Sequence, residues 1–268
     1  VFGGGKVFAQ FNNNTWIFGD SAGVNWNSTG AITQFTSAID ARGSISSISD
    51  SNGVVCYVYR KDLLIPVNGI VLNRYHLMME NGNSIYGVGW YHDRIIIPNP
   101  SNDSLLYIFS AGVTASGPYG LYFSTANYKA NNDSGIVIQK NVMLNNLPAF
   151  DALMAVRHGN GRDWWLIFQR WFPPNFTTPT NEYFLYLINP AGISGPFNQN
   201  TGLDHTTNGG HLIFSSEGNK FAMISLKGLI QLCDFDRCTG QITSFIAIQP
   251  EGPGPFPLVL TSCAFSPN

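Results

Sequence analysis

The chain has 268 residues, and its formal net charge is −2. Charged residues make up 11% of it, against about 25% in an ordinary globular domain. The longest basic block is Arg60–Lys61, so the chain lacks the clustered positive charge that a nucleic-acid or acidic-membrane binder needs. No run approaches the roughly 18 apolar residues of a membrane-spanning helix.

From residue 47 onward one pattern recurs: an apolar strand, a tight turn rich in Asn, Asp, Gly or Ser, and a second, aromatic strand. The copies occupy residues 47–58, 97–109, 156–168 and 213–224, and a fifth begins at 264–268. Their turns follow one another at intervals of 49 to 58 residues and lie at Asn52, Asn102, Asn160, Gly218 and Pro267. Asn and Gly tolerate the positive φ that hairpin turns need.

Further strands are expected between these hairpins, at Tyr183–Asn189 and Leu229–Phe235 among others. A period of about 40–50 residues with several strands per unit is typical of propeller blades. The sequence therefore predicts an all-β chain, a β-propeller of four-stranded antiparallel blades with about five blades present. Because the last hairpin lacks its return strand, we expect the propeller to be incomplete at the C-terminus. We interpret residues 1–10 as a signal-peptide remnant or N-terminal arm, and 11–268 as one propeller domain continuing beyond residue 268.

Several segments resemble a family of secreted propeller domains found in Bacteroidota surface proteins. The most specific match is Ala-Val-Arg-His-Gly-Asn-Gly-Arg-Asp-Trp-Trp at 155–165, and the others are residues 14–24, 47–53, 79–85, 234–240 and 263–268. The resemblance implies export by the type IX secretion system, often at the start of a larger chain, but it implies no specific activity. Two departures are Ser215–Gly218, where Ser-Pro-Asp-Gly is usual, and the longer loop at 171–181.

Sequence motifs for catalysis are absent: there is no Gly-x-Ser-x-Gly, His-Glu-x-x-His or phosphate-binding loop. We therefore expect no enzyme activity, no cofactor and no metal. The Asx residues at 50–52 and 131–133 lack the ligand spacing of a calcium loop and are interpreted as turn formers. His158 and Asp163 flank a Gly-Asn-Gly-Arg turn, and their preferred interpretation is structural, with Asp163 fixing the turn and His158 capping an interface between blades.

Aromatic residues at two places are candidates for binding, because exposed rings anchor protein interfaces and stack on sugars. The first is the proline-rich loop at 171–181, with Trp171, Phe172 and Phe176. An alternative, held equally, is that these rings cover the edge of a blade. The second place is Trp90-Tyr91, for which a position in the core is the preferred interpretation.

Four cysteines and two serines complete the candidate sites. In an oxidising compartment we expect Cys238 to pair with Cys263, leaving Cys56 and Cys233 buried or paired. The alternative is four reduced thiols in the core. Ser104 and Ser21 lie in Asp-Ser-apolar triplets that resemble the O-glycosylation acceptor of exported proteins in that phylum.

Together these features predict a non-enzymatic extracellular interaction module attached to the cell surface. It would form the propeller part of an adhesin, appendage or filament subunit, mediating attachment or self-assembly. The expected partners are copies of the same chain, other surface proteins or neutral glycans, with no nucleic acid and no transmembrane segment. One alternative is a secreted carbohydrate-active enzyme that uses Glu80, Asp93, His158 and Asp163. A third interpretation is an inert structural spacer.

Overall fold

Five antiparallel β-sheets make up the computed structural model of the chain. It describes residues 15–18, 21–26, 30–41, 44–50, 53–60, 69–87, 92–112, 119–171, 178–206, 209–249, 260 and 262–266. Sheet one contains β1 (Thr15–Phe18), β2 (Ala22–Trp26) and β3 (Ile32–Thr36), and sheet two contains β4 (Ile45–Asp50), β5 (Gly53–Arg60) and β6 (Gly69–Asn73). Among the described residues, no helix has the length and apolar character needed to cross a membrane.

The other three sheets have four strands each. Sheet three contains β7 (Arg94–Pro98), β8 (Leu105–Gly112), β9 (Gly120–Asn127) and β10 (Ile136–Asn145). Sheet four contains β11 (Met154–Arg157), β12 (Trp164–Gln169), β13 (Thr180–Asn189) and β14 (Gly192–His205). Sheet five contains β15 (Gly210–Phe214), β16 (Lys220–Ser225), β17 (Ile230–Asp236) and β18 (Gln241–Gln249). Strands that are consecutive in the chain are neighbours in each sheet, so the predicted all-β class is confirmed.

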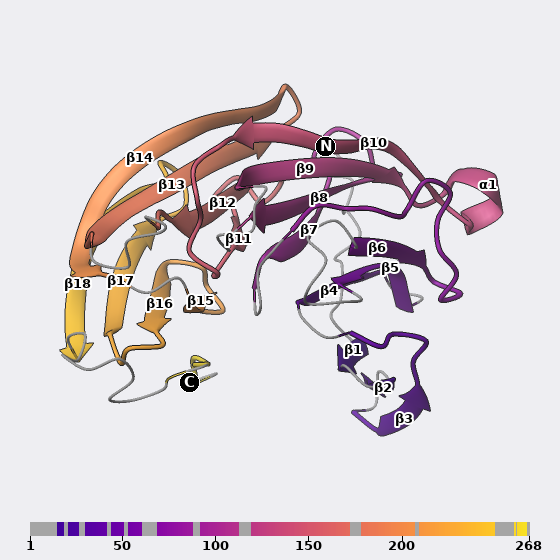
Figure 1. The fold of residues 1–268 in the computed structure, drawn as a ribbon, viewed down its shortest axis with the longest axis horizontal. Coiled ribbons are helices and arrows are strands. Elements are labelled where there is room, and N and C mark those ends of the chain that lie inside the picture. The colour runs from indigo at the N-terminus through magenta and orange to yellow at the C-terminus, as the bar shows by residue number, and fades with distance from the viewer. Residues whose placement is uncertain are drawn as a thin grey trace, which may run out of the picture.

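The sheets follow one another along an arc in chain order (Figure 1). Their first strands contact one another from sheet to sheet, since β4 touches both β1 and β7, and β11 touches both β7 and β15. The last strands, β10, β14 and β18, run along the outer side of the arc (Figure 1). The described strands of sheet one do not pack on those of sheet five, so the described arc is open between them (Figure 1).

The repeated hairpins predicted from the sequence join the first and second strands of consecutive sheets. The turn at Asn102 lies between β7 and β8, the turn at Asn160 between β11 and β12, and the turn at Gly218 between β15 and β16. Gly218 has φ +69, which a residue without a Cβ adopts at no steric cost. The turns at Asn52 and Pro267 lie outside the described residues.

Sheets one and two differ from the predicted four-stranded pattern, because each has three described strands. After β6 the chain returns beside it, with bridges from Met78 to Leu72 and from Ile85 to Gly69 and with further backbone hydrogen bonds at Val71. Between these bridges Asn81 and Ser84 have positive φ. Positive φ interrupts the regular extended backbone, so this segment pairs with β6 at several points without forming a continuous strand.

The segment 130–133 forms one short helical turn, α1 (Ala130–Asp133), rather than a regular helix. Asn131, Asn132 and Asp133 all have φ between +53 and +63, in the left-handed region where Asn and Asp are tolerated. The Asn131 amide donates to Glu80 Oε2 at 2.9 Å. These contacts agree with the interpretation of 131–133 as turn formers.

The core lies between consecutive sheets. Sheets four and five enclose Phe221, Tyr183 and Ile167, all fully buried, and sheets three and four enclose Phe109, Phe168 and other large side chains. Smaller clusters join sheet two to sheet three and sheet one to sheet two. Each inner sheet is therefore apolar on both faces, and each face is covered by the neighbouring sheet on that side.

Buried polar side chains gather at one edge of the sheets, which we call the leading edge because the first strand of each sheet begins there. The buried polar residues at this edge are Ser44, Asp93, Arg94, Ser110, Asp151, Gln169, Thr180, His205, His211, Ser225 and Gln231. The opposite edge carries the repeated hairpin turns. Some of these groups are paired, as in the Asp93–Arg94 ion pair, whereas the side chains of Ser44, Ser110 and Gln169 have no hydrogen-bond partner among the described residues.

We expect Phe221→Ala to lower the free energy of unfolding by about 3–5 kcal/mol, because it leaves a cavity between sheets four and five. The matched control is Phe245→Ala, since Phe245 is 41% exposed in the same sheet and its loss should cost under about 1 kcal/mol. Urea denaturation followed by tryptophan fluorescence measures both values. Equal effects of the two substitutions would contradict the packing of sheet four on sheet five.

Candidate functional site

Of the predicted aromatic contact residues, only Trp171 lies in the described part of the chain. Its side chain is 2% exposed, and its backbone N–H donates to the Pro148 carbonyl. The prediction that Trp171 presents its ring to solvent is therefore wrong: the ring is in the core, as the alternative of a covering role implied. Phe172, Phe176, Trp90 and Tyr91 lie outside the described residues.

The predicted disulfide between Cys238 and Cys263 is not formed, and all four cysteines are free thiols in the structure. Cys238 lies in the turn between β17 and β18, at the hairpin edge. Cys263 lies at the leading edge, where its backbone N–H donates to His211 Nδ1 at 3.2 Å. The two residues are separated by the length of a strand, whereas a disulfide needs Cα atoms within about 7 Å.

The two serines predicted as glycosylation acceptors lie in turns, and their modification remains a prediction. Ser104 is half-buried in an Asx turn, where its N–H donates to Asn102 Oδ1 at 2.9 Å. Ser21 has φ +64, and both its N–H and its carbonyl are hydrogen-bonded, to Ile39 and Ser37.

The residues considered for catalysis do not converge. Glu80 binds the Asn131 amide beside α1, and Asp93 forms an ion pair of 3.2 Å with Arg94 in which both side chains are fully buried. His158 and Asp163 lie at the hairpin edge of sheet four. A hydrolase needs two carboxylates, or a nucleophile and a base, around one point, and these residues occupy three separate places.

His158 links the hairpins of sheets four and five. Its Nδ1 accepts the Asn160 N–H at 3.0 Å, so Nε2 carries the proton and donates to the Cys238 carbonyl at 2.9 Å. The Asp163 carboxylate fixes the turn by accepting a hydrogen bond from the Arg162 guanidinium. This bond also holds the pKa of Asp163 below its usual value. These contacts match the structural interpretation of the motif at 155–165.

Side chains from several sheets meet at the leading edge, in a cluster that the sequence did not predict. The rings of His92 and His211 stack with centroids 4.2 Å apart, although His92 precedes sheet three and His211 belongs to sheet five. Asp151, at the start of sheet four, accepts the His92 backbone N–H at 2.9 Å. We call His92, Asp151, His211 and Cys263 the axial cluster, because they bring the beginnings of three sheets and the segment 262–266 to one place.

The axial cluster has no charged imidazole and no activated thiol at neutral pH. Burial lowers the pKa of His211, and it lowers the pKa of His92 to about 4 with a further contribution from His211. Both rings are therefore neutral at neutral pH. Burial also raises the pKa of the Cys263 thiol, so this thiol, 3.9 Å from His211 Nδ1, stays protonated and is not an activated nucleophile.

Sheet five presents an apolar face that no described sheet covers. The side of sheet five that carries Leu212, Met223 and Cys233 packs on sheet four. The opposite side carries a row of register partners, Ile213, Ala222, Leu232 and Ile246, and beside them the Lys220–Asp234 ion pair. Ile213, Ala222 and Leu232 in this row are partly exposed. Ile246 is 66% exposed, and Ile248, on the same strand, is 65% exposed. We call this side the outer face of sheet five.

Sheet one presents a similar face at the other end of the arc (Figure 1). Ile17 points toward sheet two, so its neighbours Trp16 and Phe18 point away from it. They are 53% and 48% exposed, and Trp26 packs edge-on against Trp16 with centroids 4.6 Å apart. The arc therefore ends in an uncovered apolar face on each side, within the described chain.

The exposed residues of β18 were not predicted from the sequence, although a signal was present. The strand Gln241–Gln249 reads Gln-Ile-Thr-Ser-Phe-Ile-Ala-Ile-Gln and contains no charge. Natural edge strands are usually protected by charged side chains, prolines or bulges. An uncharged, β-branched strand at the end of a predicted blade is thus a signal for an interaction surface.

The histidine stack predicts a pH-dependent stability. Because the pKa of His92 is lower in the folded chain than the usual 6.5, the unfolded chain takes up a proton first as the pH falls. The contribution of neutral His92 to the free energy of unfolding is complete above pH 6.5. It is lost between pH 6.5 and about 4, by up to roughly 3 kcal/mol. His92→Gln cannot take up this proton and should show a shallower fall in urea denaturation across that range. Superimposable pH profiles of the two proteins would contradict this account.

No family model matches the sequence, and no curated protein matches it. Solved structures to which the chain has a distant similarity include a candidate exo-β-1,3-galactanase from Bifidobacterium bifidum, at 9% identity and TM-score 0.46, covering 87% of this chain and 78% of that one. A candidate 6-phosphogluconolactonase from Bacteroides uniformis has 13% identity and TM-score 0.43, covering 94% and 67%. An auxiliary nutrient binding protein from Bacteroides thetaiotaomicron has 11% identity and TM-score 0.42, covering 88% and 57%. At these values the chain is placed in no family.

Proposed function

We propose that this chain is a non-enzymatic interaction module of the cell surface, in which the five sheets are blades of a β-propeller. In this proposal the module is exported and assembles with a second copy of the chain through the outer face of sheet five. Such a module would serve an adhesin, an appendage or a filament. The low charge and the resemblance of segments such as 155–165 to exported propellers support the extracellular setting.

Two features support the propeller arrangement. The first strands of consecutive sheets contact one another on the inner side of the arc, and the last strands lie on the outer side. In addition, His92 and His211 touch across sheet four, with centroids 4.2 Å apart, although their sheets are not consecutive. Sheets that fan out around an axis approach one another at its centre in this way.

The outer face of sheet five is the observation that carries the proposed assembly. Its apolar row ends on Ile246 and Ile248, each about two-thirds exposed, and the outer edge of β18 has no pairing partner among the described strands. Burying such side chains gains about 25 cal/mol per Å² of apolar surface. A second copy offers a matching partner, because β18 has no charged residue and pairing of identical strands brings no like charges together.

We expect the chain to self-associate in a concentration-dependent way, measured by sedimentation velocity. Replacing Ile246 and Ile248 together by Lys should weaken the association by at least about tenfold, because charges would have to be buried in the contact. Both positions are exposed in the monomer, so the thermal midpoint should hardly change. The matched control is the pair Gln241→Lys and Thr243→Lys, which adds the same two charges at other exposed positions of β18.

Two results would contradict the proposal. A chain that remains monomeric at all concentrations would favour the inert spacer. Association that survives the paired lysine substitution would show that another surface mediates it. Cleavage of a polysaccharide, lost on substitution of Glu80 or Asp163, would instead establish the alternative of a carbohydrate-active enzyme.

A further inference from the structure

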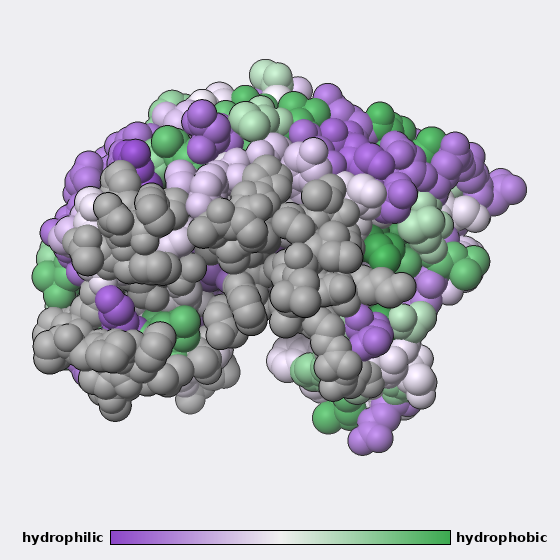
Figure 2. Space-filling model, viewed as in Figure 1, coloured by the Kyte–Doolittle hydropathy of each residue, from purple (hydrophilic) through white to green (hydrophobic). Residues whose placement is uncertain are grey.

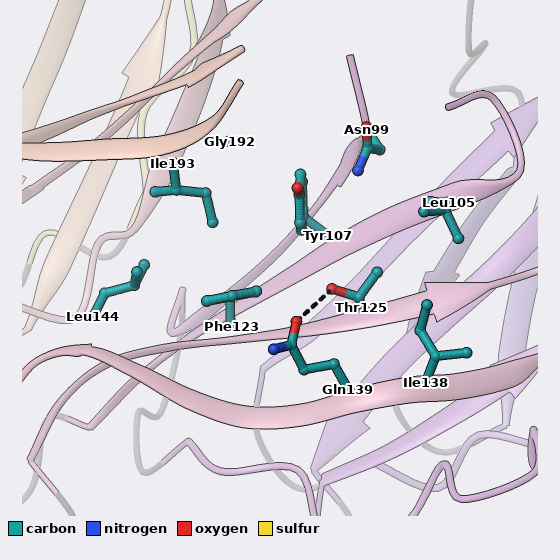
Figure 3. Close-up of a pocket in the computed structure, with 10 residues that line it drawn as sticks. All are labelled: Asn99, Leu105, Tyr107, Phe123, Thr125, Ile138, Gln139, Leu144, Gly192 and Ile193. Carbon is teal, nitrogen blue, oxygen red and sulfur yellow. Dashed lines mark hydrogen bonds between the residues drawn. The ribbon is translucent and has the colours of Figure 1, made fainter. Parts of the chain in front are cut away.

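A groove of about 420 Å³ separates sheet three from the turn that joins β13 and β14. Its floor is formed by Tyr107 and Phe123 on β8 and β9, and Ile193 of sheet four lies on the opposite side (Figure 3). Its volume lies within the range of about 300–1,000 Å³ that is typical of small-molecule sites. The groove is distant in sequence and in the fold from the outer face of sheet five, so a ligand bound in it would not depend on the proposed assembly.

The apolar part of the groove is aromatic. The rings of Tyr107 and Phe123 meet edge to face, with centroids 5.8 Å apart, and both side chains are half-buried. They rest on the core between sheets three and four, which holds their orientation. Part of each ring is therefore accessible to a ligand and is fixed in position before the ligand arrives.

The polar part consists of amides and hydroxyls. The Tyr107 hydroxyl and the Asn99 side chain both line the groove, and the buried Thr125 hydroxyl donates to Gln139 Oε1 at 3.5 Å. The exposed Gln139 amide NH₂ is then directed by this bond while its donors remain available to a ligand (Figure 3). None of the described residues that line the groove is charged.

A bulge in β10 brings Gln139 to this place. Strand residues normally alternate between the two faces of a sheet, yet the neighbours Ile138 and Gln139 both line the groove. The register between β9 and β10 shifts on both sides of Gln139. Bulges are over-represented beside binding sites because they redirect a side chain, and here one places an amide next to two aromatic rings.

We infer that this groove binds a neutral carbohydrate. The C–H faces of a sugar ring pack on aromatic side chains, and its hydroxyls both donate and accept hydrogen bonds, as amides and Tyr and Thr hydroxyls do. Ligands with carboxylate or phosphate groups need Arg or Lys at such a site. Purely aliphatic ligands would leave the amide and hydroxyl groups without partners, which is costly.

The inference is tested with four neutral disaccharides as probes: maltose, cellobiose, lactose and N,N′-diacetylchitobiose. Saturation-transfer NMR identifies binding, and isothermal titration calorimetry gives the affinity. We expect at least one of them to bind, and a uronic-acid disaccharide not to bind. Gln139→Leu and Tyr107→Phe should each weaken binding by about three- to tenfold, because each removes a hydrogen bond and keeps the side-chain volume.

The matched control is Met143→Gln, since Met143 is 54% exposed on the same strand but does not line the groove. Its affinity should equal that of the unmodified chain, and thermal midpoints verify that all variants fold. The titrations use the chain carrying Ile246→Lys and Ile248→Lys, so that failure of assembly and failure of sugar binding are distinguished. Absence of binding by all four probes overturns the inference, as does equal binding of the uronic-acid disaccharide or unchanged affinity in both groove variants.

Discussion

The stacking of one sheet on the next is the interaction on which the rest of this structure depends. Each inner sheet is apolar on both faces, so it is stable only with a neighbour on either side. Phe221 illustrates the principle: it belongs to sheet five, yet it contacts the Tyr183 ring of sheet four with centroids 5.6 Å apart. The same principle leaves the two end sheets with one unsatisfied face each, and the proposed assembly is a consequence of this.

The two edges of the stack are held together differently. At the hairpin edge, His158 joins consecutive sheets, because one ring nitrogen bonds the Cys238 carbonyl and the other accepts the Asn160 N–H, which holds the ring in place. At the leading edge, His92 and His211 join sheets that are not consecutive, and buried polar groups such as the Asp93–Arg94 pair surround them. In the view of Figure 2, hydrophilic and hydrophobic residues are interspersed along the outer side of the arc.

The sequence was sufficient for the fold class and for the hairpins, because those depend on local signals. Asn160 and Gly218 mark turns through backbone preferences that act within a few residues, and the structure has turns at both. The sequence did not predict contacts between residues that are far apart in the chain. Trp171 is buried by packing that no local pattern encodes, and Cys238 and Cys263 lie at opposite edges because of strand direction. The axial cluster joins positions more than a hundred residues apart, so no spacing rule could reveal it.

The scarcity of charge on β18 has a consequence for the conditions in which the module works. Dissolved salt screens attractions between charges, with a Debye length of about 8 Å at physiological ionic strength, but it screens apolar contacts hardly at all. A contact through Ile246 and Ile248 should therefore hold equally well in dilute and in saline surroundings. Without electrostatic steering, it should also form slowly, at the roughly 10⁵–10⁶ M⁻¹s⁻¹ of uncharged partners. Such a surface is suited to subunits that associate slowly and then stay bound.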